Sequence, residues 1–288
     1  MGRRGQLKPK LGDEMVVEVH AVAPDGSGIG RGAADETVRI SGVLPDERVT
    51  ATLAHVRRDG LHFARLGRVD RASLLRQASP CRHFLTCGGC DFLHASYAWQ
   101  LDWKRRRVAK ALQRPLTDVA PTVPSPKPLA YRGLVKLVRG PKACLGSYAP
   151  RTHDVVDMSD CVVHATGAEA IAAACRAFID RQPVYFRYLL LRWSFQQARA
   201  VVTIVVRQRD AGIDPLVAFF SERSDVGQVR VHVNDDEGDA LLSAAADEIV
   251  YDDGHPVIER IGSVDQNLAG GAFAQINPGA AALLYARV

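Results

Sequence analysis

Short hydrophobic runs with an alternating pattern dominate the first part of the chain. Residues 15–22, 37–40, 47–53 and 61–66 have this character, and turn signals separate them. Such closely spaced short strands are typical of a small β-barrel. A glycine-rich run at 26–32 has neither the spacing of a nucleotide-binding loop nor a helix after it, so it predicts a β-turn or bulge.

The pattern then becomes helical over residues 97–113, where Ser96 is the expected N-cap and Arg114-Pro115 ends the periodicity. Apolar residues fall on one stripe, and five cations lie largely outside it: Lys104, Arg105, Arg106, Arg107 and Lys110. This concentrated charge predicts a nucleic-acid contact, with a solvated helix face as the alternative.

Proline-rich sequence over 115–128 predicts an extended linker. Beyond it, strand-like runs mix with few helices, which favours an α+β domain. Strands are expected at 133–138, 188–193, 200–206 and 229–233, and helices at 167–180 and 215–222. The expected organisation is a basic tail over 1–10, a barrel over 11–72, a cysteine loop with the basic helix over 73–114, the linker over 115–128, and the α+β domain over 129–288.

Composition is that of a globular protein, with 47% hydrophobic and 24% charged residues among 288. No apolar run is long enough for a membrane span, and the N-terminus lacks a secretory signal, so we expect a cytoplasmic protein, by default a monomer. Residues 1–115 hold 20 Lys+Arg against 12 Asp+Glu, whereas 116–288 hold 17 against 20. A polyanion is therefore the expected partner of the first half.

Four of the six cysteines have the spacing of metal ligands. Cys81, Cys87 and Cys90 lie on one short loop, and Cys161 is far downstream. Three local thiolates and one distant thiolate are a common arrangement for a 4Fe-4S cluster, whereas zinc loops more often repeat a Cys-x-x-Cys pair. The expected metal ligands are these four residues. A structural zinc site and a coincidence of buried thiols are the alternatives.

Several segments together resemble the bacterial 23S ribosomal RNA uracil-carbon-5 methyltransferases that carry a TRAM domain and a 4Fe-4S cluster. The resemblance covers nearly the whole chain. The matching segments are residues 28–31 and 42–49 of the barrel, 80–94 and 97–104 around the cysteine loop, 131–133, 146–148 and 153–161 of the central part, and 271–278 near the end.

The resemblance implies an OB-like TRAM barrel that binds RNA, with 23S rRNA as the expected partner, and a cluster with a structural role. It implies that Gln275, in the segment Phe-Ala-Gln-Ile-Asn-Pro, contacts the methyl donor S-adenosylmethionine. It also adds Arg31 and Arg132 to the helix cations as expected RNA contacts.

The family's Rossmann-like methyltransferase domain is expected to follow Pro278, and the chain given ends at Val288. We find no Gly-rich strand-to-helix turn for the methyl donor. The expected fold class is therefore a multidomain protein from which that domain is absent, truncated after its RNA-binding part. Catalysis on uracil needs a cysteine nucleophile, and the two remaining cysteines, Cys144 and Cys175, are not expected to be catalytic. A standalone, non-catalytic RNA-binding iron–sulfur or zinc module is the alternative function.

Overall fold

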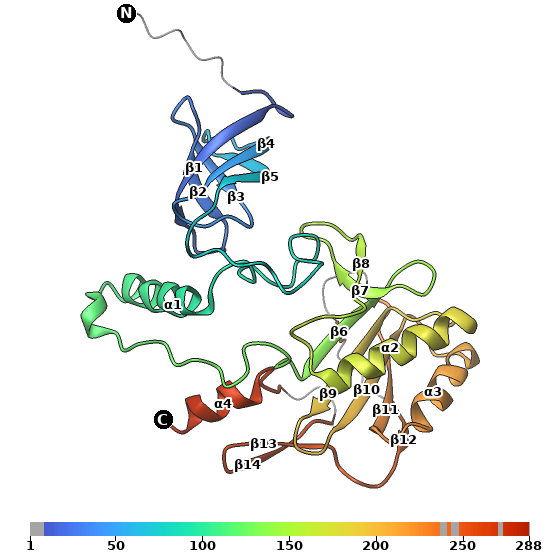
Figure 1. Ribbon diagram of the computed structural model, residues 1–288. Coiled ribbons are helices and arrows are strands. Elements are labelled where there is room, and N and C mark those ends of the chain that lie inside the picture. Colours follow the sequence, from blue (N-terminus) through green and yellow to red (C-terminus); the bar gives the residue numbers. More distant parts are fainter. Residues whose placement is uncertain (1–8, 237–240, 243–247, 270–272, 288) are drawn as a thin grey trace, which may run out of the picture. The chain divides into compact units, whose positions relative to one another are not determined.

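The computed structural model describes residues 9–236, 241–242, 248–269 and 273–287, and it forms two compact units, residues 1–123 and 124–288 (Figure 1). The first unit holds a barrel and one long helix, and the second holds a seven-stranded sheet. Residues 1–8 of the expected basic tail lie outside the described residues, as do Gly271 and Ala272 of the last matching segment.

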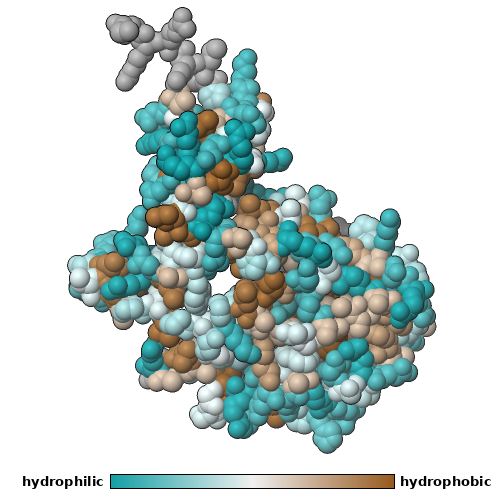
Figure 2. All heavy atoms as spheres, in the orientation of Figure 1, coloured by the Kyte–Doolittle hydropathy of each residue, from teal (hydrophilic) through white to brown (hydrophobic). Residues whose placement is uncertain are grey.

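The expected barrel is present and closed, with the strand order β1-β2-β3-β5-β4. Alternate residues of β1 are buried, so Met15, Val17 and Val19 face the interior. Figure 2 shows a mainly hydrophilic surface over this part of the chain, while apolar side chains fill the barrel interior. The strands are β1 (Glu14–Val22), β2 (Gly28–Arg31), β3 (Thr37–Ile40), β4 (Arg48–Val56) and β5 (His62–Arg71).

Two glycines allow β2 to lie close to its neighbours. A Cβ at Gly28 would lie 2.2 Å from Cγ2 of Val43, and one at Gly30 would lie 2.4 Å from Cγ1 of Val17. Neither contact is sterically possible, so both positions require a residue without a side chain. The glycine-rich run contains the predicted turn, where the N–H of Gly26 donates to the carbonyl oxygen of Ala23 at 3.0 Å, and it continues as strand β2.

The expected basic helix is confirmed as α1 (Tyr97–Ala111), which the 3-10 helix η1 (Leu116–Asp118) follows. The hydroxyl of Ser96 accepts a hydrogen bond from the N–H of Trp99 at 3.4 Å, as an N-cap does. Ala109 is buried, whereas Val108 and Leu112 of the expected apolar stripe are exposed.

The second unit is built on a mixed sheet with the strand order β12-β11-β10-β9-β6-β7-β8. Helices α2 and α3 cover one face, where a continuous core joins Ile171 and Cys175 of α2, Leu216 of α3, and buried residues of the central strands. The elements are β6 (Leu134–Arg139), β7 (Leu145–Tyr148), β8 (Val155–Asp157), α2 (Thr166–Arg181), β9 (Tyr188–Ser194), β10 (Arg199–Val206), α3 (Asp214–Ser221), β11 (Val226–Val233) and β12 (Glu248–Asp252).

The expected fold class needs correction in this unit. Strands β10 and β11 pair in parallel, and the chain crosses between them through η2 (Ala211–Ile213) and α3. This strand–helix–strand crossover is of the α/β type and was not expected, whereas the other five strand pairs of this sheet are antiparallel.

The last described part forms a hairpin and a helix that the sequence pattern did not predict. Asn277 caps the helix, because its Oδ1 accepts the N–H of Ala280 at 3.0 Å, and its Nδ2 donates to Oγ of Ser125 at 3.0 Å. No helix in the described ranges combines the length and apolar character needed to cross a membrane. The elements are β13 (Ile258–Ile261), β14 (Val264–Asn267) and α4 (Pro278–Tyr285).

Candidate nucleic-acid interface

A buried ion pair attaches the cysteine loop to the barrel. The carboxylate of Glu47 is fully buried and accepts hydrogen bonds from Nε of Arg76 at 2.5 Å and from Nη2 at 2.8 Å. The N–H of Leu44 donates to the same carboxylate at 2.8 Å. Burial alone would raise the pKa of Glu47, but the hydrogen bonds from Arg76 and Leu44 outweigh it, so the pKa is lowered and the carboxylate stays charged.

Contacts of the loop itself strengthen this attachment. Leu85 packs on the turn at Gly42, where φ is +80° and a Cβ would lie 2.7 Å from the Leu85 side chain. His94 at the end of the loop is 2% exposed, and its ring lies 5.0 Å from that of Phe84. Burial and the nearby charge of Arg76 lower the pKa of His94 to about 4, so its imidazole is neutral at pH 7.

The three local cysteines of the expected cluster lie half-buried on this loop. The N–H of Gly89 points to Sγ of Cys87 at 3.3 Å, a contact of the kind that tunes cluster sulfurs. Among the residues that the structure describes, however, no three His, Cys, Asp or Glu side chains gather in a group that could hold a metal ion. The cluster therefore stays a prediction.

Cys161, the expected fourth ligand, lies in the second unit beside a histidine. Nδ1 of His164 is 2.8 Å from Oε2 of Glu169. Burial alone would lower the pKa of His164, but hydrogen bonds to Cys161 and Glu169 outweigh it and raise the pKa to about 9. Burial alone would raise the pKa of Cys161, and the hydrogen bond with His164 reverses this, so the pKa of the thiol is lowered. The local environment thus favours a thiolate.

The five cations of α1 are not equivalent. Nε of Arg105 donates to the carbonyl oxygen of Val119 at 2.7 Å, and its Nη2 donates to that of Leu116 at 2.9 Å, so this side chain fastens η1 to the helix. Arg106 pairs with Asp102 at 2.5 Å.

The remaining helix cations are better placed for a ligand. The guanidinium of Arg107 lies 5.4 Å from the ring centroid of Trp103. Lys104 and Lys110 are exposed and form no ion pair with a described residue. The helix therefore presents fewer available charges than its sequence suggests.

The other two expected RNA contacts lie in different units. Arg31, at the end of β2, is exposed and pairs with Asp35, the N···O distance being 3.8 Å. Arg132 precedes β6, and its Nε is buried without a hydrogen-bond partner among the described residues. A buried, unpaired guanidinium nitrogen is costly, so Arg132 has donor capacity that an anionic ligand could use.

Gln275, the expected cofactor contact, immediately precedes the short connection to α4. Its Nε2 lies 3.5 Å from the hydroxyl of Tyr285, and the side chain is half-exposed. The neighbouring carbonyl oxygen of Ile276 accepts the N–H of Gly133 at 3.0 Å, which holds this segment against the start of β6. The backbone beside Gln275 is therefore fixed, while its side-chain amide forms only one long hydrogen bond. The amide can accordingly turn to contact a ligand.

The two other cysteines are held as protonated thiols. Burial raises the pKa of Cys175, in the α2 core, to about 12. Burial followed by the charge of Asp157 raises the pKa of the Cys144 thiol as well. A nucleophilic cysteine reacts as its thiolate, so these environments favour structural roles for both residues.

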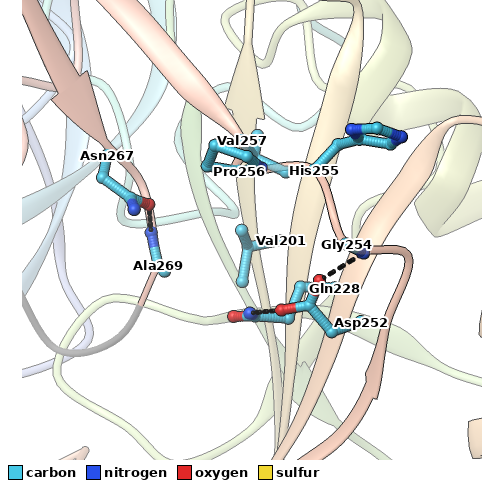
Figure 3. A pocket seen from close by; sticks show the side chains of 9 residues that line it. All are labelled: Val201, Gln228, Asp252, Gly254, His255, Pro256, Val257, Asn267 and Ala269. Carbon is cyan, nitrogen blue, oxygen red and sulfur yellow. Dashed lines mark hydrogen bonds between the residues drawn. The ribbon is translucent and has the colours of Figure 1, made fainter.

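A cavity of about 350 Å³ lies on the sheet face opposite α2 and α3, with its floor formed by Val201 of β10 and Gln228 of β11 (Figure 3). Nε2 of Gln228 donates to Oδ2 of Asp252 at 2.6 Å, and the N–H of Gly254 donates to Oδ1 at 2.8 Å. Figure 3 shows that the imidazole of His255 points away from Val201. The carboxylate of Asp252 and the amide of Gln228 can form hydrogen bonds with a ligand in this cavity. No sequence motif predicted the cavity.

The chain is similar in sequence to RNA methyltransferases. The chain is 31% identical to an uncharacterised RNA methyltransferase of Geobacter sulfurreducens, over 97% of this chain and 60% of that protein. It is 32% identical to a 23S rRNA (uracil(1939)-C(5))-methyltransferase of Halomonas elongata, over 68% of this chain and 41% of that protein. No protein-family model matches the chain. Its homologues are RNA methyltransferases, and it spans 60% of the length of the first of them.

A solved structure shares the fold. The Pyrococcus abyssi tRNA (uracil-54, C5)-methyltransferase in complex with S-adenosyl-L-homocysteine matches with a TM-score of 0.72 and 22% identity, over 94% of this chain and 64% of that chain. The expected absence of a methyltransferase domain is corrected by this match. The match covers 94% of this chain and includes both the barrel and the large sheet. The comparison therefore does not support a fold from which the methyltransferase part is absent.

Proposed function

We propose that this chain acts in the methylation of carbon 5 of uracil in RNA, with S-adenosylmethionine as methyl donor; none of its described cysteines is assigned as the nucleophile of that reaction. The observation that carries the proposal is the similarity to RNA methyltransferases along 97% of the chain. The shared fold with a uracil-C5 methyltransferase supports the same reaction. Since a relative at 32% identity is named for 23S rRNA, we propose 23S rRNA as the substrate.

RNA binding by the first unit follows from its charge. Arg31 and the available helix cations Lys104, Arg107 and Lys110 present positive charge for phosphates. Such contacts position the RNA without reading its sequence, and their strength falls as salt rises. Trp103, beside Arg107, offers an aromatic face of the kind that stacks on unpaired bases.

The methyl donor supplies an electrophilic methyl group when bound, and Gln275 is the residue of this chain that we propose to contact it. Its amide is oriented by the Tyr285 hydroxyl and backed by the hydrogen bond between Gly133 and Ile276. An amide offers both a donor and an acceptor, which suits the amino acid or base part of such a ligand.

Cys81, Cys87, Cys90 and Cys161 are the proposed ligands of a 4Fe-4S cluster. The spacing of the cysteines, the Gly89 amide directed at Cys87 and the lowered pKa of Cys161 support it. Anaerobic purification followed by iron, sulfide and zinc analysis tests it. About four irons per chain are expected, lost in Cys87→Ser and Cys161→Ser but kept in Cys144→Ser, a half-buried cysteine outside the set. Stoichiometric zinc in place of iron would overturn the assignment.

Deletion of the gene that encodes this chain tests the proposed reaction in the cell. Nucleoside mass spectrometry of separated 23S rRNA and tRNA should show loss of 5-methyluridine from 23S rRNA, restored by the intact gene but not by a Gln275→Ala version. Unchanged 5-methyluridine in both RNA classes would refute the proposed function. Loss from tRNA alone would keep the reaction and overturn the substrate.

A further inference from the structure

One corner of the sheet in the second unit carries a group of cationic and aromatic side chains. They lie on the face opposite α2 and α3. Val135 and Leu137 of β6 belong to the core under the helices, so Lys136, between them, lies on the other face. Tyr188 of β9 shares this face, because it pairs with Val138, two positions from Lys136. Tyr148 of β7 is two positions along from Gly146, which also pairs with Val138. Three strands thus bring these side chains together.

Short distances between these side chains define the group. Nζ of Lys136 lies 4.8 Å from the ring centroid of Tyr188 and 6.0 Å from that of Tyr148. The two tyrosine hydroxyls are 3.5 Å apart. The ring of His153 meets that of Tyr148 edge-on at 5.4 Å. The two phenol rings therefore hold the ammonium beside two hydroxyl groups.

The charge at this corner is not balanced within the described chain. Lys136 is exposed and has no carboxylate of a described residue at ion-pair distance. Arg187 lies 5.3 Å from the Tyr188 ring centroid, and its Nη1 donates to the carbonyl oxygens of Asn234 and Asp236 rather than to a carboxylate. Burial raises the pKa of Tyr148 to about 12, so its hydroxyl stays a neutral donor. All of these groups favour an anion.

We propose that Lys136, Tyr148, Tyr188 and His153 bind single-stranded RNA, with the ammonium and hydroxyls on a phosphate and the imidazole against an adjacent base. The proposal rests on the proposed function for the choice of polymer. An exposed corner with one unpaired ammonium is too open to retain a free phosphate ion, whereas a polymer brings many phosphates and gains from each added contact. The complementary charge and the aromatic rings identify this occupant.

The test measures affinity of the 288-residue chain for a fluorescein-labelled single-stranded RNA by anisotropy at several salt concentrations. Lys136→Ala should weaken binding about fivefold or more and reduce the slope of log K against log salt by about 0.7, the value for one lost phosphate contact on a single strand. Tyr188→Phe, which removes only the hydroxyl, should weaken binding less.

The matched control is Lys127→Ala. Lys127 is also exposed and lies 5.5 Å from the ring centroid of Phe195 in the same unit, but that ring has no hydroxyl. The control should change affinity less than twofold. Equal losses in the Lys127 and Lys136 variants would overturn the site while leaving RNA binding, and with it the proposed function, intact.

Crosslinking of the unaltered chain provides an independent check that does not depend on a variant folding. A 4-thiouridine-containing single strand should give adducts on peptides that contain Tyr148, His153 or Tyr188, and adducts only elsewhere would overturn the site. A chain that binds no RNA would refute both proposals, whereas binding at this corner without 5-methyluridine loss on gene deletion would refute the proposed function alone. A dimer that Lys136→Ala dissociates without changing RNA affinity would identify the corner as a contact between copies instead.

Discussion

Arg76 holds the buried carboxylate of Glu47 with two nitrogens, Nε on Oε1 and Nη2 on Oε2, and so joins the segment after the barrel to the barrel loop. Its Nη2 also donates to the carbonyl oxygen of Gly42 at 2.7 Å, beside the position where Leu85 packs. The cysteine loop is thereby attached at both its beginning and its middle. The positions of Cys81, Cys87 and Cys90, the proposed cluster ligands on this loop, depend on this attachment.

Glu47→Gln should destabilise the first unit by about 3–5 kcal/mol, because it leaves Arg76 without its buried counter-charge. Urea unfolding followed by tryptophan fluorescence measures the effect. Asp102→Asn, which breaks the exposed pair with Arg106, is the control and should change stability by less than about 0.5 kcal/mol. Similar effects for the two changes would show that the buried pair contributes no more than an exposed one.

His94 should make the first unit sensitive to mild acid. Its pKa falls from 6.5 to about 4 on folding, so the unfolded chain binds a proton that the folded one rejects. The resulting stability is complete above pH 6.5 and is lost as the pH falls toward 4, amounting to about 3 kcal/mol. Glu47, whose pKa is lowered from 4.5, adds a further loss as the pH falls below 4.5.

Unfolding free energies at pH 7.0, 6.0 and 5.0 test this window. His94→Phe, which keeps a ring of similar size, should flatten the dependence between pH 6.5 and 5, and His20→Phe on the barrel surface should not. A wild-type curve that is already flat above pH 5 would contradict the role assigned to the buried imidazole.

The cations of α1 should separate into a structural and a ligand-binding class. Arg105→Ala removes two hydrogen bonds to carbonyl oxygens and should cost about 2–3 kcal/mol of stability. Lys104→Ala and Lys110→Ala should leave stability unchanged but weaken RNA binding and its salt dependence. Thermal unfolding and RNA anisotropy on the three variants distinguish the classes. Loss of RNA affinity in Arg105→Ala alone would reverse the assignment.

Two glycine substitutions should have opposite effects. Gly30→Ala places a Cβ 2.7 Å from the carbonyl oxygen of Glu18, so the barrel should lose several kcal/mol of stability or fail to close. Gly279→Ala in the first turn of α4 meets nothing closer than 3.5 Å and should stabilise by up to about 1 kcal/mol. Equal changes in the free energy of unfolding, measured with urea, would show that the close approach of neighbouring atoms is not the reason for a glycine at position 30.

Short-range features of this protein could be read from its residues. Alternation over 15–22 and the N-cap at Ser96 are local signals, and β1 and α1 follow them closely. The short strands β7, β8, β13 and β14 carry too few residues for a clear period and were missed. Each of them pairs with a strand that is close in sequence, β7 with β6 and β8, and β13 with β14, so the local turns rather than a hydrophobic period define these strands.

The sequence by itself determined the barrel, the basic helix, the cysteine spacing and the resemblance to RNA uracil methyltransferases, because each is written in residue types at short separations. Only the tertiary structure decided which charges are available. In it, Arg105 donates to backbone carbonyl oxygens, Glu47 is buried against Arg76, and Lys136 lies near two tyrosines from other strands, away from every described carboxylate. The reason is that long-range packing determines which partners a charged side chain meets. The parallel pairing of β10 and β11 also could not be predicted from local periodicity, because it joins strands separated by a helix.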